Sequence, residues 1–224
     1  MGIDKEGFCS VIMEGRGIPA KGAFPSSFTY GNDAVETVSY DPEEAKKLLE
    51  ESGWTDTDGD GYVDKDGQKL TINWLTYPTR LEQPKLAEYA QATLKEIGID
   101  VSVNNTSDHR TYAENGEFDV YVSSLTTAPT GDPEYFFSST VTGSKNYGNY
   151  QNDEVTKLTE QLHQTFDTDE RGKLAVELQQ KILDDDAYFF VSHLNMGIVT
   201  KANVTGMAAH PCDYYEITAD LDVQ

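Results

Sequence analysis

A strand, a helix and a second strand follow one another within residues 70–103, and this order constrains the fold more than any other feature of the sequence. Residues 70–77 alternate apolar and polar side chains and are rich in β-formers, which predicts a strand. In residues 81–97 apolar side chains recur every three or four positions up to Gly98, which predicts a helix. In residues 99–103 apolar and polar side chains again alternate with a period of two, which predicts a second strand. This arrangement is typical of a βαβ crossover, so we expect an α/β fold with a mixed sheet flanked by helices.

The flanking sequence predicts further helices and strands. Asp41 can cap a helix and Pro42 suits its first position, so a helix should run from there to near Gly53. A third strand, two more helices and a buried strand are expected at 118–125, 153–166, 169–184 and 188–191. The second of those two helices should start at an Asp cap, Asp169. Long loops are expected at 15–40 and 126–133, which are rich in turn-forming residues.

The charge of the chain excludes one class of partner. There are 39 acidic and 17 basic residues, and the formal net charge is −22. A field of that sign repels polyphosphate and anionic lipid, so we expect no nucleic-acid partner. No apolar run of about 18 residues occurs, so we expect no membrane span. The first residues also lack the basic and apolar segments of an export signal.

Residues that often carry catalysis or bind transition metals are scattered along the chain. Cys9 and Cys212 lie near opposite ends without a Cys-x-x-Cys spacing, which leaves two separate thiols or one bridge open. None of the four histidines pairs with another at helical spacing; they are His109, His163, His193 and His210. No nucleophile elbow, phosphate-binding loop or dinucleotide fingerprint is present. We therefore expect a protein that is not an enzyme.

One acidic loop, at residues 56–67, has much of the spacing of a calcium site. Oxygens at loop positions one, three, five, seven and nine are what a hard cation needs. The candidate ligands are Asp56, Asp58, Asp60, the Tyr62 carbonyl and Asp64. Position twelve is Gly67 in place of a bidentate Glu, and the residues after it predict a strand rather than a helix. The loop could be a solvated acidic turn or a weak calcium site, and both interpretations remain open. The calcium interpretation implies an alternative function, that of a calcium-stabilised structural or adhesion module.

Several blocks of sequence occur in an order that points to one family. Residues 40–54 read Tyr-Asp-Pro-Glu-Glu-Ala-Lys-Lys-Leu-Leu-Glu-Glu-Ser-Gly-Trp and are followed by the acidic Asp-Gly-Asp-Gly turn. Further blocks lie at 3–6, 15–20, 76–80, 94–101, 132–133 and 150–155. Together they resemble the carboxy-terminal half of the family 5 extracellular solute-binding proteins, the receptor subunits of dipeptide, oligopeptide and nickel ABC importers.

The resemblance implies a fold and a setting. The fold would be one lobe of a two-lobed periplasmic-binding-protein type II structure. Because family members are typically more than twice this length, we expect a fragment, in which residues 1–195 form most of the second lobe and 196–224 return toward a first lobe. The parent protein would be extracytoplasmic, in the periplasm or lipid-anchored at the cell surface. It would deliver a peptide, nickel or a metallophore to ABC permease subunits.

The resemblance also places the ligand between the lobes, at strand ends, where α/β folds usually bind ligands. The candidate contacts lie in or after the loops that follow the first and third strands; they are Arg80, Thr126, Thr127, Thr130, Lys145 and Tyr147. The tryptophan and the amine-binding aspartate of dipeptide receptors fall on Thr126 and Pro129, and the histidine of the nickel branch falls on Lys145. The two cations, Arg80 and Lys145, would suit a ligand that carries carboxylates.

Overall fold

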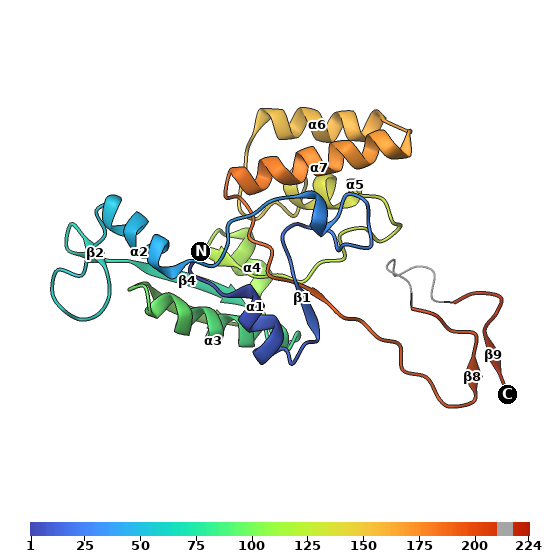
Figure 1. The fold of residues 1–224 in the computed structure, drawn as a ribbon, viewed down its shortest axis with the longest axis horizontal. Helices are drawn as coiled ribbons and strands as arrows, with labels where there is room; N and C mark the ends of the chain where they lie inside the picture. The colour runs from blue at the N-terminus through green and yellow to red at the C-terminus, as the bar shows by residue number, and fades with distance from the viewer. Residues whose placement is uncertain (210–216) are drawn as a thin grey trace. The chain divides into compact units, whose positions relative to one another are not determined.

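The computed structural model describes residues 1–209 and 217–224. Its contacts divide the chain into two units, each built from two separate stretches (Figure 1). Unit 1 comprises residues 1–15 and 38–124, and unit 2 comprises residues 16–37 and 125–224. The expected division of the chain at residue 195 stays a prediction.

The main element of unit 1 is a parallel three-stranded sheet in the order β5-β4-β6. The central strand β4 (Thr71–Thr76) pairs along its whole length with β5 (Asp100–Asn105). Helix α3 (Glu82–Lys95) connects the two strands and packs against them, burying Leu86, Ala87, Ala90 and Leu94 (Figure 1). The predicted strand–helix–strand unit is therefore confirmed. The sheet itself is parallel throughout, and antiparallel pairs occur in separate two-stranded sheets.

The third strand is shorter than predicted. Of residues 118–125, which were expected to form this strand, only β6 (Val120–Tyr121) forms a ladder with β4. Two further backbone hydrogen bonds, from Asp119 N to Asn73 O and from Val122 N to Leu75 O, extend the pairing on either side of β6. The chain then leaves the sheet, because the next amide that could extend it, Ser124 N–H, donates to the Tyr77 hydroxyl instead.

Unit 1 contains further short elements besides this sheet and α3. Helix α2 (Pro42–Glu51) begins as predicted, with the Asp41 carboxylate accepting a hydrogen bond from Glu44 N at 2.9 Å. Three short helices were not predicted from the sequence: α1 (Lys5–Gly7), the π-helix η1 (Phe8–Ile12) and α4 (His109–Glu114). A short antiparallel hairpin of β2 (Asp64–Lys65) and β3 (Gln68–Lys69) was not predicted either. Phe8 is buried and its ring packs 5.8 Å from that of Tyr89 on α3.

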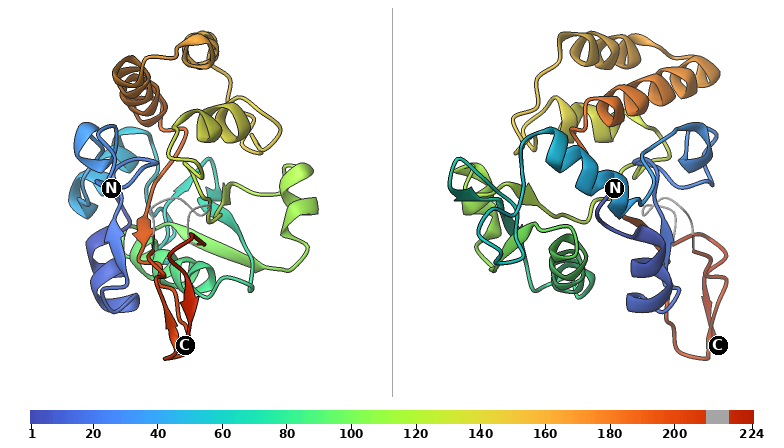
Figure 2. Two further views of the ribbon diagram at one scale, coloured as in Figure 1. Left: turned by 90° about the vertical axis from the view of Figure 1, so that its right-hand side faces the viewer. Right: turned by 60° about the vertical axis from the view of Figure 1, so that its left-hand side comes forward.

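Unit 2 is built mainly from helices. Helices α6 (Asp153–Gln164) and α7 (Thr168–Asp184) lie side by side, and the short α5 (Glu134–Phe136) continues into the π-helix η3 (Phe137–Val141) (Figure 2). Both long helices were predicted. The predicted cap of the second, Asp169, is wrong: the Asp167 carboxylate accepts hydrogen bonds from the first two amides that follow Thr168.

An aromatic cluster forms the core of unit 2. Phe24 is fully buried. Its ring centroid lies 5.0–6.0 Å from the ring centroids of Tyr30, Phe136 and Phe137. The segment that carries Phe24 is a loop, as predicted, apart from β1 (Gly17–Pro19) and the 3₁₀ helix η2 (Asn32–Ala34). The predicted buried strand at 188–191 is wrong. β7 starts later, at Ser192–Leu194, where it pairs antiparallel with β1, and the aromatic run instead supplies rings to the core.

The last residues add little to that core. Strands β8 (Val204–Thr205) and β9 (Asp222–Val223) pair with each other, while Met196, Val199 and Ile217 are largely exposed. Cys212 and His210 lie outside the described residues, so the question of a Cys9–Cys212 bridge stays open; Cys9 itself is buried. Within residues 1–209 and 217–224, no helix combines the length and the apolarity needed to cross a bilayer.

Candidate functional site

The carboxyl ends of the parallel strands in unit 1 gather a group of polar and aromatic side chains, which we call the edge cluster: Tyr77, His109, Tyr121 and Ser124. Tyr77 directly follows β4, His109 opens the helix after β5, and Tyr121 ends β6. The imidazole of His109 stacks on the ring of Tyr77, and its Nδ1 lies 2.7 Å from the Tyr121 hydroxyl oxygen. Parallel strands end at one edge of a sheet, which is the usual ligand-binding edge of α/β folds.

The surroundings of His109 favour the neutral form of its imidazole. Burial lowers its pKa below the ordinary value, and the nearby Arg110 cation lowers it further. A neutral imidazole offers one N–H and one lone pair. Since Nδ1 faces Tyr121, the Nε2 atom is the one through which the ring can meet a further group. Sequence reasoning set this histidine aside because no second histidine lies at helical spacing.

Ser124 ties the cluster to the start of helix α3. Its hydroxyl donates to Glu82 Oε1 at 2.9 Å and lies 2.7 Å from the side-chain amide nitrogen of Gln83. Arg80, one of the predicted ligand contacts, stands in the turn between Tyr77 and this helix and is exposed. The cluster therefore fixes both ends of the turn that carries Arg80.

The predicted binding loop of unit 2, residues 126–132, is anchored at several points. The Thr127 hydroxyl donates to Ala23 O at 2.9 Å, and the Tyr30 hydroxyl donates to Gly131 O at 2.7 Å. Thr126 and Thr130 are exposed. Of the predicted threonines, Thr127 thus already uses its hydroxyl within the unit, whereas Thr130 presents its side chain to solvent.

Lys145 is held beside an aromatic residue that the sequence did not single out. Its Nζ donates to the Tyr135 hydroxyl at 3.0 Å and lies 5.3 Å from the centroid of that ring. Tyr147 is half-buried, and its backbone N donates to Lys145 O. Tyr135 escaped notice because α5, which carries it, was not predicted. Arg80 belongs to unit 1 and the other five predicted contacts to unit 2, so their joint role stays a prediction.

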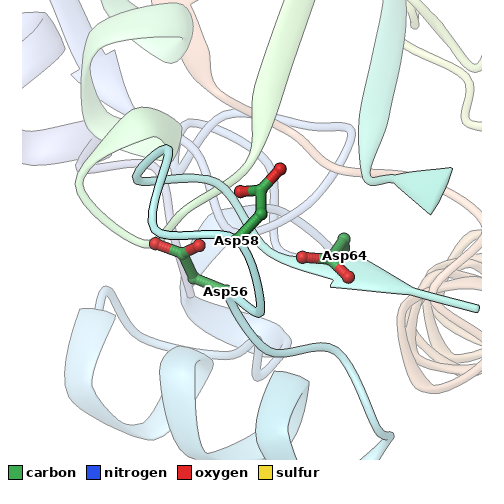
Figure 3. Close-up of side chains that lie close together, drawn as sticks. All are labelled: Asp56, Asp58 and Asp64. Atoms are coloured by element: carbon green, nitrogen blue, oxygen red, sulfur yellow. The ribbon is translucent and has the colours of Figure 1, made fainter. Parts of the chain in front are cut away.

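The acidic loop brings three of its candidate ligands together (Figure 3). Carboxylate oxygens of Asp56, Asp58 and Asp64 lie within 4.8 Å of one another. Asp60 is engaged elsewhere, in an ion pair with Lys69 at 2.6 Å whose hydrogen bond lowers the pKa of Asp60. After Gly67 the chain continues into β3 and β4, so the predicted strand in place of an exit helix is confirmed.

The loop is also closed by its own backbone. Asp56 accepts hydrogen bonds from Gly59 N and Gly61 N, and Asp64 accepts one from Thr57 N. These bonds spread the carboxylate charge over amide dipoles, so the turn can hold its shape without a cation. A calcium ion at this loop stays a prediction.

Comparison with known proteins gives the family. The model of the bacterial extracellular solute-binding proteins, family 5 Middle, matches residues 1–148, so the chain belongs to this family. It is similar to the oligopeptide-binding protein AppA of Bacillus subtilis, with 32% identity over 96% of this chain and 41% of that protein. It is also similar to the nickel-binding periplasmic protein of Escherichia coli, with 27% identity over 93% of this chain and 41% of that protein.

Solved structures agree on the fold. The structure of AppA in complex with a nonapeptide superposes with a TM-score of 0.78 at 28% identity, covering 96% of this chain and 44% of that one. The structure of Staphylococcus aureus NikA in complex with Ni(L-His)2 superposes with a TM-score of 0.78 at 25% identity, covering all of this chain and 46% of that one. The α/β fold is thus of the periplasmic-binding-protein type II class. The chain spans about two fifths of the length of the curated relatives named above.

Proposed function

We propose that this chain is the carboxy-terminal part of the solute-binding receptor of an ABC importer. The observation that carries the proposal is the similarity to the peptide-binding protein AppA over 96% of the chain. The receptor captures its ligand without covalent chemistry and is not an enzyme. Closure of two lobes hides the ligand from water, and the closed form is recognised by the permease subunits. Like other members of this family, the protein works outside the cytoplasm.

The ligand class follows from the two exposed cations among the predicted contacts. Arg80 and Lys145 each present a positive charge in a chain of net charge −22. Such cations form charge-assisted hydrogen bonds with carboxylates. We therefore favour a ligand with carboxylate groups, which a peptide, a histidine complex of nickel and a metallophore all share. Thr126, Thr127, Thr130 and Tyr147 would contribute polar contacts around it.

Isothermal titration of the full-length receptor tests this proposal. The probes are a mixture of short peptides and Ni(L-His)2, and the variants are Arg80→Ala and Lys145→Ala. Each variant should bind the preferred probe at least about tenfold more weakly, which corresponds to the loss of about 1.4 kcal/mol. Lys173→Ala, which removes an exposed lysine of α7, is the matched control and should bind normally. Unchanged binding by both binding-loop variants would remove the carboxylate assignment.

A calcium ion at the acidic loop is a separate and smaller proposal. The three carboxylates of Asp56, Asp58 and Asp64 support it, because their charges repel one another unless a cation or solvent compensates them. The alternative function as a structural or adhesion module finds no support among the relatives, which are binding proteins of transport systems. Calcium would then serve stability only.

A further inference from the structure

Arg171 lies in the first turns of helix α7 with its side chain only 14% exposed. Its Nε and Nη2 donate to the two carboxylate oxygens of Asp132 at 2.8 and 2.6 Å. Nη2 also donates to Glu134 at 3.1 Å. Nη1 donates to the backbone oxygens of Leu162 and Thr165, both at 2.6 Å. Every N–H of the guanidinium group therefore has an acceptor.

The acceptors on the two sides of this guanidinium differ in kind. On one side are the backbone oxygens of Leu162 and Thr165 at the end of α6, where the last carbonyls lack the usual amide partner four residues further on. On the other side is Asp132, the last residue of the loop at 126–132. A bidentate arginine–carboxylate pair fixes direction as well as distance. Arg171 therefore holds the end of the loop against the turn between the two long helices.

The rest of the loop is held by neutral hydrogen bonds. The Tyr30 hydroxyl fixes Gly131, and Thr127 is fixed to Ala23. Ala128 and Pro129 are buried between these anchors, which leaves Thr130 as the side chain of 127–131 that is exposed. A loop anchored at both ends around one exposed residue has few conformations to lose when a ligand arrives.

We propose that Arg171 is a positioning residue for ligand capture: through Asp132 it keeps the loop at 126–132 in its binding conformation before the ligand arrives. The inference rests on the proposed receptor function. It concerns a residue that lies 39 positions from Asp132 in sequence and that is outside the predicted contacts. Arg171 acts through the loop and need not touch the ligand.

Hydrogen exchange on the ligand-free receptor tests the positioning directly. In Arg171→Gln, the amides of residues 126–132 other than Pro129 should exchange at least about tenfold faster, because the loop opens without the rest of the unit. The buried half of α7, residues 174–183, should exchange as in the wild type. Asp132→Asn, which keeps the shape of the acceptor but removes its charge, should give a smaller acceleration. Lys173→Gln, which removes an exposed ion pair two residues away on the same helix, is the control and should change neither region.

Titration of the same variants with the peptide mixture and with Ni(L-His)2 gives the second readout. At a temperature where all variants are folded, Arg171→Gln should weaken binding about tenfold, and Arg171→Lys should recover part of the loss. Faster exchange without weaker binding would overturn the proposal, as would unchanged exchange. If the wild type bound neither probe, the proposed function would fail for these ligands, whereas the exchange measurement would still decide whether Arg171 holds the loop.

Discussion

The imidazole ring of His109 lies nearly flat on the phenol ring of Tyr77, with the ring centroids 4.1 Å apart and 21° between the planes. The two residues follow different strands of the parallel sheet. Their contact is possible only because β4 and β5 end at the same edge in register, with Thr76 opposite Asn105. The stacking of these two side chains therefore depends on the register in which β4 pairs with β5.

His109 should make stability depend on pH. Burial and Arg110 hold its pKa in the folded state below the unfolded value, so the unfolded chain binds the proton more readily. This stabilising contribution is complete above the unfolded pKa, about 6.5, and is lost as the pH falls through the lower folded pKa. The drop in melting temperature on acidification should be smaller in His109→Gln than in the wild type. Equal drops would show that another group is responsible, and Arg110→Gln should fall between the two.

Removal of the Phe24 ring should destabilise unit 2 strongly. The ring is fully buried among Tyr30, Phe136 and Phe137, so Phe24→Ala leaves a cavity and should lower the free energy of unfolding by about 3–5 kcal/mol. The control is Phe166→Ala, which truncates a side chain that is 92% exposed and should change stability by less than about 0.5 kcal/mol. Urea unfolding of both variants measures the difference. Similar losses in the two would contradict the core assignment.

The two aspartates at the start of α7 should differ in their effect on stability. Asp167 accepts hydrogen bonds from the backbone N of Asp169 and of Glu170, so Asp167→Ala should cost about 1 kcal/mol. Asp169 does not cap the helix and acts through the helix dipole and its attraction to Lys173, so Asp169→Ala should cost about 0.5 kcal/mol or less. Chemical denaturation of the pair checks this order, and a larger loss for Asp169→Ala would restore the cap expected from the sequence.

The calcium proposal predicts a rise in melting temperature when millimolar calcium replaces a chelator. With calcium well above its dissociation constant, the shift should be roughly 5 °C or more. Asp56→Asn should abolish it. Asp66→Asn removes a charge from the same loop but lies outside the carboxylate group, and asparagine tolerates the positive φ of 54° at that position, so it should retain the shift. If the wild type has the same melting temperature in calcium and in chelator, the calcium proposal is wrong and the loop is a solvated turn.

Sequence reasoning succeeded where the signal is local. The period of residues 70–103 gave the βαβ unit, and Asp41 with Pro42 gave the start of α2, because caps and amphipathic stripes depend on neighbouring residues alone. It failed where tertiary packing determines the local backbone conformation. The aromatic run at 188–191 has strand-forming residues, yet its rings complete the core of unit 2 instead of a ladder.

The candidate sites show the same division. Residues 126–132 could be predicted as a loop from their composition, and the acidic turn could be recognised from its spacing. The edge cluster could not, because Tyr77, His109 and Tyr121 meet only through the register of a sheet. The pairing of Arg171 with Asp132 was equally hidden, since nothing in either local sequence specifies a partner 39 residues away.

The interleaving of the two units determines the order in which they can form during synthesis. Unit 1 needs residues 1–15 and then 38–124, so it can close before unit 2 has been made. Phe24 and its neighbours emerge from the ribosome early but find their aromatic partners only after Phe136 and Phe137 have followed. Until then an apolar segment stays uncovered on a growing polypeptide, which is the kind of species that chaperones protect. The nascent chain therefore needs such protection over an interval in which all the residues of unit 1 have already been made.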